Sequence, residues 1–176
     1  MGWDGDGTAD AEYTAYVTGR LAWLHKVAVL LCQDPARAED LVQTAAIRLY
    51  VHWARARKAD NLDGYVRTLL VRVFLAEQGT AWWRRVVTVR QPPDAAGRAA
   101  DPDAALDLRA ALAALGPRQR AVVVLRFYCD LSVEQTAREL GCTPGTVKSQ
   151  SSRALAALRA RLTAADDRDL SRERLA

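Results

Sequence analysis

The fold is decided by residues 131–149, which read LSVEQTARELGCTPGTVKS. Two helix starts are marked in this segment, because Ser132 can cap one helix and Thr143 can cap another whose first residue is Pro144. Gly141 stands between them, where the chain must leave the first helix through a backbone conformation that a side chain disfavours. The segment therefore predicts two helices joined by a tight turn.

Three further residues make this turn specific. Gln135 lies three residues after the Ser132 cap, at the position that completes a capping box. Ala137 is small enough to let the second helix approach the first, and Val147 closes the small core between them. Alanine, glycine and valine are thus spaced by four and then six residues, which is the helix-turn-helix pattern. In that motif the second helix enters the major groove of DNA.

The charge of the second helix supports the same interpretation. Residues 144–162 contain no acidic side chain. A basic run on a helix is more often a solvated face than a binding site, but the turn pattern and charge of one sign together favour DNA binding. The basic residues of this stretch are Lys148, Arg153, Arg159 and Arg161.

Composition limits the class of protein. The chain has 176 residues, of which 50% are hydrophobic, so it can form one ordinary domain or two small ones. Its net charge is +4, yet the first twelve residues carry four acidic side chains and no basic residue precedes Arg20. The basic residues are therefore concentrated elsewhere, as a nucleic-acid surface requires.

The chain offers no pattern for a metal, a cofactor or a membrane. Three widely separated cysteines and two histidines predict reduced thiols without a metal site. The apolar segment 21–32 is short and is interrupted by His25 and Lys26, so it cannot span a bilayer. An acidic N-terminus is unlike a signal peptide, which predicts a cytoplasmic protein. No phosphate loop or activated nucleophile is recognisable in the sequence, so we do not expect an enzyme.

Helical periodicity organises the first half of the chain. One helix is expected to end near residue 33, and a second begins with Asp34 as its cap and Pro35 as its first residue. A basic loop follows at 54–61, and a third helix is expected over 62–76 or beyond. The expected buried residues are Ala38, Leu41, Val42, Ala45, Leu49 and Trp53 in the second helix, and Tyr65, Leu69, Val73 and Ala76 in the third.

The second half follows a stretch rich in proline and glycine, which is typical of a linker. Helices at 104–115 and 117–128 are expected before the helix-turn-helix. The predicted fold class is all-α, with a three- to four-helix domain and a four-helix domain joined by a flexible linker. The expected segments are an acidic tail at 1–9, a domain at 10–86, a linker at 87–103, a domain at 104–165 and a charged tail at 166–176.

Taken in order, these motifs resemble the extracytoplasmic-function sigma factors of the sigma-70 family, and actinobacterial members in particular. The resemblance depends on AEDLVQ at 38–43, the basic loop, WRR at 83–85, the linker and TVKS at 146–149. It implies sigma domains two and four, which bind core RNA polymerase at its clamp coiled coil and its flap. The implied function is promoter recognition, DNA melting and transcription initiation, with promoter DNA as a partner and an anti-sigma protein as a candidate partner.

The resemblance also implies three groups of binding residues. Toward the polymerase clamp it places Glu39, Asp40, Leu41 and Gln43. Toward the minus-ten element it places Arg55, Arg57, Lys58, Asn61, Arg67, Arg72, Arg84 and Arg85, with Trp82 or Trp83 as a stacking face or as a core residue. Toward the minus-thirty-five element it places Thr143, Thr146, Lys148, Ser149, Ser152 and Arg153.

Departures from commoner members leave two points open. Residues 77–80 replace an acidic-basic run that is common there, so the register of contacts after Ala76 is undecided. Gln150 stands where an arginine is frequent, and the promoter sequence cannot be read from the chain. The alternative function is a stand-alone helix-turn-helix regulator of the response-regulator type. That alternative predicts specific DNA binding without polymerase and gives no reason for the basic loop.

Overall fold

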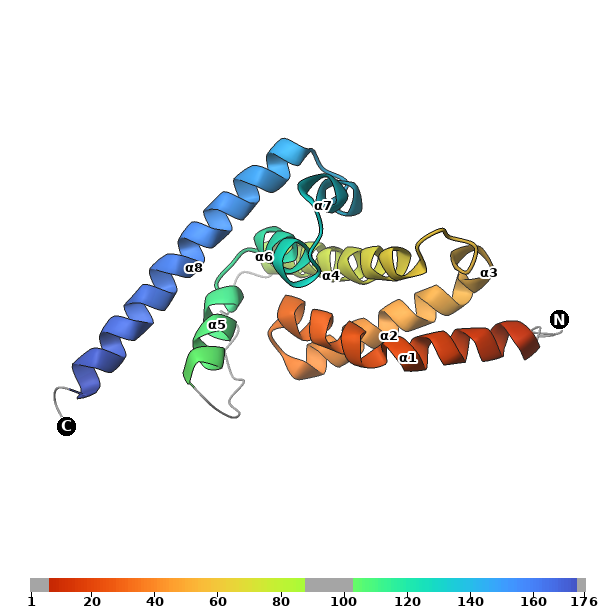
Figure 1. The fold of residues 1–176 in the computed structure, drawn as a ribbon, viewed down its shortest axis with the longest axis horizontal. Coiled ribbons are helices and arrows are strands. Elements are labelled where there is room, and N and C mark those ends of the chain that lie inside the picture. The colour runs from red at the N-terminus through yellow and green to blue at the C-terminus, as the bar shows by residue number, and fades with distance from the viewer. Residues whose placement is uncertain (1–6, 88–102, 174–176) are drawn as a thin grey trace. The chain divides into compact units, whose positions relative to one another are not determined.

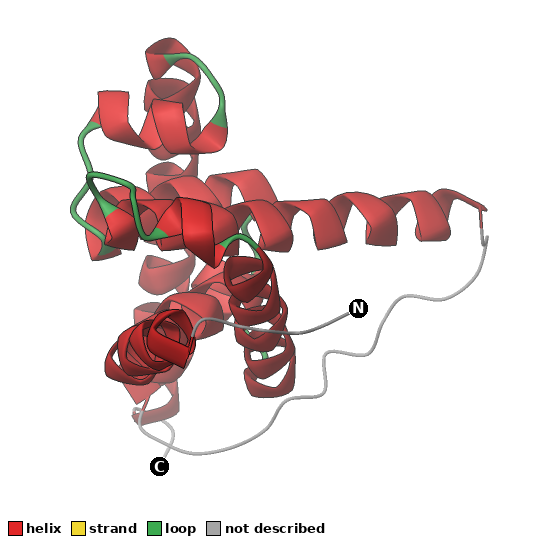
Figure 2. Cartoon of the chain, turned by 90° about the vertical axis from the view of Figure 1, so that its right-hand side faces the viewer, coloured by secondary structure: helices red, strands yellow, loops and turns green. Residues whose placement is uncertain are grey.

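The computed structural model describes residues 7–87 and 103–173, and its side chains are described at 7–79 and 108–163. The chain divides into two compact units, Met1–Glu77 and Gln78–Ala176. Every regular element in the described residues is a helix (Figure 2). The predicted all-α fold class is therefore confirmed.

The first unit contains α1 (Gly7–Cys32), α2 (Pro35–Val51), the short α3 (Trp53–Ala56) and the first part of α4 (Leu62–Val87). Helices α1 and α2 lie side by side and antiparallel (Figure 1). Asp34 caps α2 as predicted, because its Oδ1 accepts hydrogen bonds from the amides of Ala36, at 2.9 Å, and of Arg37, at 3.2 Å. The turn between the helices is thus set by a local polar side chain.

The core of the first unit contains the whole stripe predicted for α2. Burial removes these residues from water, which is the main favourable contribution to folding. The buried residues of α2 and α3 are Ala38, Leu41, Val42, Ala45, Leu49, Trp53 and Ala56, and those of α1 are Leu24, Val27, Ala28, Leu31 and Cys32. Cys32 is a free thiol, as are the half-buried Cys129 and Cys142 of the second unit.

The buried face predicted for α4 is confirmed only at Val73 and is wrong at its other three positions. Tyr65 and Leu69 are only half-buried and Ala76 is exposed. The reason is that two overlapping apolar stripes run along this helix, and packing buries the one that contains Phe74. Phe74 is the largest fully buried side chain among the described residues. The buried residues of α4 are Val66, Leu70, Val71, Val73 and Phe74.

Two other boundaries differ from the sequence-based expectation. Helix α1 begins at Gly7, so the expected tail at 1–9 already turns helical within its last residues. The expected loop at 54–61 begins as the short helix α3, because Trp53 and Ala56 are buried and draw the chain onto the core.

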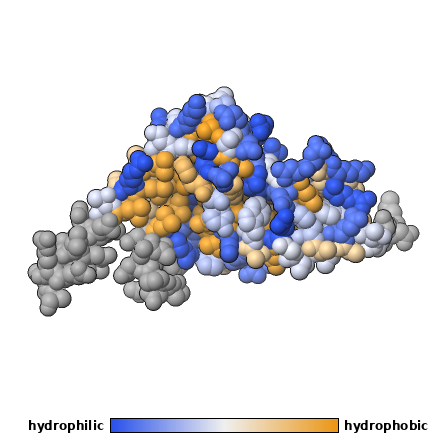
Figure 3. All heavy atoms as spheres, in the orientation of Figure 1, coloured by the Kyte–Doolittle hydropathy of each residue, from blue (hydrophilic) through white to orange (hydrophobic). Residues whose placement is uncertain are grey.

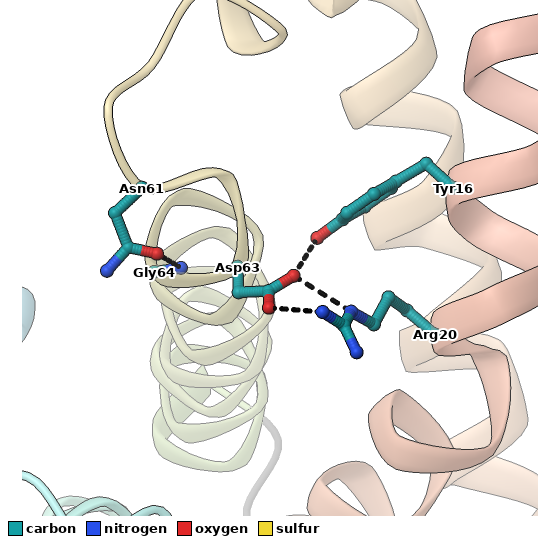
Figure 4. A network of polar contacts seen from close by, with 5 residues as sticks. All are labelled: Tyr16, Arg20, Asn61, Asp63 and Gly64. Atoms are coloured by element: carbon teal, nitrogen blue, oxygen red, sulfur yellow. Dashed lines mark hydrogen bonds and ion pairs between the residues drawn. The ribbon is translucent and has the colours of Figure 1, made fainter.

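A polar network joins α1 to the first turn of α4 (Figure 4). The Tyr16 hydroxyl donates to Asp63 Oδ1 at 2.9 Å. Arg20 donates from Nε to the same oxygen at 2.9 Å and from Nη2 to Asp63 Oδ2 at 2.7 Å. Beside it, the side-chain oxygen of Asn61 accepts from the Gly64 amide at 2.8 Å and so caps α4. The start of α4 is therefore held by both a cap and a bidentate ion pair.

Replacing Tyr16 with phenylalanine should lower stability by about 1 kcal/mol at pH 8, because one hydrogen bond to a carboxylate is lost. Burial and the Asp63 carboxylate raise the pKa of Tyr16 above its ordinary value of 10.0. A raised pKa in the folded state means that the stabilising effect is complete below pH 10 and is lost as pH rises through the folded-state pKa. Urea unfolding at pH 8 and above pH 10 checks this. Between pH 8 and the higher pH, Tyr16→Phe should lose less of its free energy of unfolding than the unmodified protein does. Tyr128→Phe, at an exposed position, is the control and should have the same free energy of unfolding as the unmodified protein at both pH values.

The second unit contains α5 (Asp103–Ala113), α6 (Pro117–Val123), the π-helical segment η1 (Val124–Tyr128), α7 (Val133–Leu140) and α8 (Pro144–Glu173). The helix predicted over 117–128 thus changes to a π-helical pattern in its second half, where the Cys129 amide donates to the Val124 carbonyl at 3.0 Å. Helix α8 continues to Glu173, so most of the expected charged tail at 166–176 extends this helix. The expected linker at 87–103 falls mainly on residues 88–102, outside the described residues.

Within residues 7–87 and 103–173, no helix combines the length and apolar character needed to cross a membrane. Nor do those residues bring together three or more potential metal ligands from histidine, cysteine, aspartate and glutamate.

Candidate nucleic-acid and polymerase interfaces

Both helix starts of the helix-turn-helix have the caps that the sequence predicts. Ser132 Oγ accepts from the Gln135 amide at 3.1 Å, and the Ser132 amide donates to Gln135 Oε1 at 2.7 Å, which completes the capping box. Thr143 Oγ1 accepts from the Thr146 amide at 3.1 Å, and the two threonine hydroxyls are 2.9 Å apart. The threonines therefore have a structural role that is independent of any ligand.

The turn between α7 and α8 depends on Gly141. This residue has φ of +63°, in the left-handed region, and the next amide, of Cys142, donates to the Ala137 carbonyl at 3.0 Å. Ala137 and Val147 are buried together with Val122 of α6, as the sequence predicts. These contacts place α7 beside the first turns of α8 (Figure 1).

Replacing Gly141 with alanine should destabilise the second unit by about 1–2 kcal/mol, because an L side chain disfavours the left-handed conformation. A Cβ at this position would meet no atom within 4 Å, so the cost is conformational rather than steric. Gly141→Asn is the matched control, since asparagine adopts this conformation more readily, and it should cost clearly less. Equal unfolding midpoints in urea for the alanine and asparagine variants would contradict the explanation.

The start of α8 presents a polar and basic surface. The side chains of Lys148, Ser149, Ser152 and Arg153 are all exposed, so all four are available to a ligand. Helix α8 has no acidic residue before position 163. Glu134 lies on the neighbouring α7. Hydrogen bonds from its own backbone amide and from the Ser132 hydroxyl lower the pKa of Glu134, and the positive charges of Lys148 and Arg126 lower it further.

The basic segment predicted to bind the minus-ten element lies on the corner formed by α3 and the turn before α4. Arg55, Arg57, Lys58 and Asn61 are exposed there, and Figure 3 shows mostly hydrophilic residues over this corner. Within the described part of the chain, two of them have side-chain interactions that can be named. Asn61 caps α4, and Arg57 Nη1 forms an ion pair with Glu12 Oε2 of α1 at 2.8 Å. Glu12 was not among the predicted site residues, and it lies 45 residues from Arg57 along the chain.

The remaining members of the minus-ten group are on α4. Arg72 is exposed and Arg67 is half-buried. The side chains of Arg84 and Arg85, with those of Trp82 and Trp83, lie outside the described residues.

The residues predicted to contact polymerase are on α2, and one of them has to be removed from the group. Leu41 is 0% exposed, so its side chain is a core residue and cannot contact a partner directly. Glu39, Asp40 and Gln43 are exposed. Ile47 is also exposed, at 65%, although it is apolar, and its spacing from Asp40 and Gln43 places it on the same face of the helix. The sequence contained a signal for this exposure, because Ile47 is apolar but does not belong to the predicted buried stripe of α2.

Comparison with known proteins assigns both units to one family. The family described as Sigma-70 region 2 matches residues 17–84, and Sigma-70, region 4 matches residues 105–158. RNA polymerase sigma-E factor of Streptomyces coelicolor is 39% identical over 164 residues, which cover 88% of each chain. The ECF RNA polymerase sigma factor SigL of Mycobacterium tuberculosis is 33% identical over 149 residues, covering 78% of this chain and 81% of SigL.

The chain belongs to the extracytoplasmic-function sigma factors of the sigma-70 family. A solved structure also resembles this sigma factor: RpoE of Bartonella quintana, crystallised in complex with the anti-sigma factor NepR. Its TM-score is 0.67 at 24% identity, over 86% of this chain and 97% of that one. This likeness supports the fold. The family resemblance seen in the sequence is therefore confirmed, and the two matched regions contain the exposed members of all three groups that were predicted from it.

Proposed function

We propose that this sigma factor binds core RNA polymerase and directs it to promoters, where it assists DNA melting and transcription initiation. The observation that carries the proposal is the family match over both regions, in a chain whose helix-turn-helix is fully capped and presents an acid-free helix start. The polymerase performs the chemistry, and the sigma factor contributes binding energy without catalytic residues. We further propose that the protein performs this role in the cytoplasm.

For the minus-thirty-five element, the proposed contacts come from the start of α8. Arg153 suits bidentate hydrogen bonding to guanine, Lys148 suits a phosphate, and the serines can donate to either. The hydroxyl groups of Thr143 and Thr146 are already engaged in the cap of α8. We therefore propose that the two threonines act indirectly, by holding the N-terminal end of the helix against a phosphate. The full group is Thr143, Thr146, Lys148, Ser149, Ser152 and Arg153.

For the minus-ten element, the proposed contacts come from the corner at α3 and from α4. Exposed basic side chains can hold the phosphates of an unpaired strand, and their number makes such binding dependent on salt. Arg55, Arg57 and Lys58 are suited to this by exposure and charge. Asn61, Arg67, Arg72, Arg84 and Arg85 complete the proposed group.

For the polymerase, we propose that the clamp coiled coil binds the exposed face of α2 through Glu39, Asp40 and Gln43, with the flap as the partner of the second unit. Leu41 contributes by packing α2 onto the core. Because the structurally similar RpoE was solved with an anti-sigma factor, a protein of that kind is a second proposed partner for these surfaces.

The test is promoter-dependent transcription from a pool of genomic fragments with bacterial core polymerase that lacks its own sigma factor. Discrete start sites that require the purified chain would support the proposal. Asp40→Ala and Gln43→Ala should weaken core binding in a pull-down, whereas Lys26→Ala, at an exposed position of α1, should not. Duplex DNA binding without core binding or start sites would instead indicate a stand-alone regulator.

A further inference from the structure

The acidic beginning of α1 contacts the basic segment that we assign to the minus-ten element. Glu12 Oε2 lies 2.8 Å from Arg57 Nη1, and their side chains are 50% and 36% exposed. Among the described residues, this ion pair is the one that engages the segment 55–58 with a carboxylate. The Glu12 carboxylate therefore occupies one of the guanidinium donors of Arg57, and the proposed function uses that guanidinium group to bind a DNA phosphate.

The position of Glu12 is fixed by its neighbours on α1. Two residues before it, Asp10 Oδ1 accepts from the Tyr50 hydroxyl at 3.0 Å. One residue after it, the Tyr13 hydroxyl donates to the Ala46 carbonyl at 2.9 Å, and the Tyr13 ring meets the Trp53 ring edge-on at a centroid distance of 5.5 Å. These contacts attach the first turns of α1 to α2 and α3. The backbone of Glu12 is therefore held at a position from which its side chain contacts Arg57.

The chemistry of the pair makes Glu12 a competitor for nucleic acid. Carboxylate and phosphate oxygens both use the same fork of guanidinium donors. A partly exposed ion pair is weak and exchanges easily, so a phosphate can displace Glu12. Until that happens, the carboxylate lowers the positive potential at the segment 55–58.

We propose that Glu12 is an autoinhibitory residue, which occupies Arg57 in the free sigma factor and lowers its affinity for single-stranded DNA. The proposal rests on the proposed function of Arg57 as a phosphate contact. When the DNA strand is loaded, phosphate replaces the carboxylate, and the pair therefore reduces unproductive binding of the free protein without blocking the loaded complex.

The test uses the full chain and a fluorescein-labelled oligothymidine of about 20 nucleotides, a length that exceeds one binding site. Fluorescence anisotropy over a range of salt concentrations gives the affinity and its salt dependence. Glu12→Gln should bind about two- to fivefold more tightly, the range that a surface ion pair can contribute. Because Arg57 contacts a phosphate in the loaded complex of both proteins, the slope of log affinity against log salt should change by much less than the about 0.7 that one phosphate contact contributes. Asp130→Asn makes the same change in charge in the second unit and should alter neither value.

A double-mutant cycle separates this inference from the function on which it rests. Arg57→Gln should weaken binding, and the gain from Glu12→Gln should vanish when both substitutions are combined. If Arg57→Gln weakens binding but Glu12→Gln does not strengthen it, or if the gain persists in the double variant, autoinhibition by Glu12 is wrong and the assignment of Arg57 stands. If Arg57→Gln leaves binding unchanged, the assignment of Arg57 itself is wrong. Equal urea midpoints for all variants show that folding is unaffected.

Discussion

Replacing Phe74 with alanine is expected to destabilise the first unit by about 3–5 kcal/mol, the largest effect of any single change that we predict. Phe74 is fully buried on α4, among the side chains that close the core of this unit. Its removal deletes a large apolar surface and leaves a cavity that the packed helices can fill only partly. Because a small domain has only about 5–15 kcal/mol of total stability, much of the first unit should be unfolded at moderate urea concentration.

The other phenylalanine provides the control for this prediction. The chain contains two, and Phe127 is 54% exposed on η1 of the second unit. Phe127→Ala should change stability by less than about 0.5 kcal/mol, as is usual for surface substitutions. Circular dichroism and tryptophan fluorescence during urea unfolding measure both. A cost below about 1 kcal/mol for Phe74→Ala would contradict the packing of α4 described here.

Replacing Arg153 with alanine is expected to lower affinity for the minus-thirty-five element by about 5- to 150-fold, because a bidentate contact to guanine contributes about 1–3 kcal/mol of discrimination. Arg153 is exposed at the start of α8, one turn after Ser149, and its removal creates no cavity. The fold should be unchanged, so the loss should appear in DNA binding and in promoter-dependent transcription but not in urea unfolding.

Two further variants show whether Arg153 reads a base or binds a phosphate. Arg153→Lys keeps the charge and loses the planar fork, so it should restore little of the affinity if the contact is bidentate. Arg159→Ala removes an exposed arginine from the same helix outside the proposed group and should have a small effect. A loss of affinity equal for all DNA sequences, with a salt slope reduced by about 0.9, would indicate a phosphate contact instead.

Most of the helix-turn-helix could be predicted because its determinants are local. The caps at Ser132 and Thr143 each join groups within three residues of one another, and the left-handed turn at Gly141 depends on one residue. Such features have the same physical cause in a peptide segment as in the folded chain. The group at the start of α8 was implied by the family resemblance, and its members Lys148, Ser149, Ser152 and Arg153 are exposed in the structure.

The register of α4 could not be predicted in this way. The stripe of Tyr65 and Leu69 and the stripe of Val66 and Leu70 are both apolar, and both fit the helical period. Only the packing around Phe74 distinguishes them. For Leu41 the sequence supported both a core position and a polymerase contact, and its complete burial decides for the core.

The sequence by itself determined the all-α class, the helix-turn-helix with its caps, the acid-free start of α8 and the resemblance to the sigma factor family, because each depends on residues close together in the chain or on their order. Only the tertiary structure decided which face of α4 is buried, that Asp63 joins Tyr16 and Arg20, and that Glu12 occupies Arg57. These partners are 43 to 47 residues apart, and no local pattern specifies which distant side chains the packing of the helices will bring into contact.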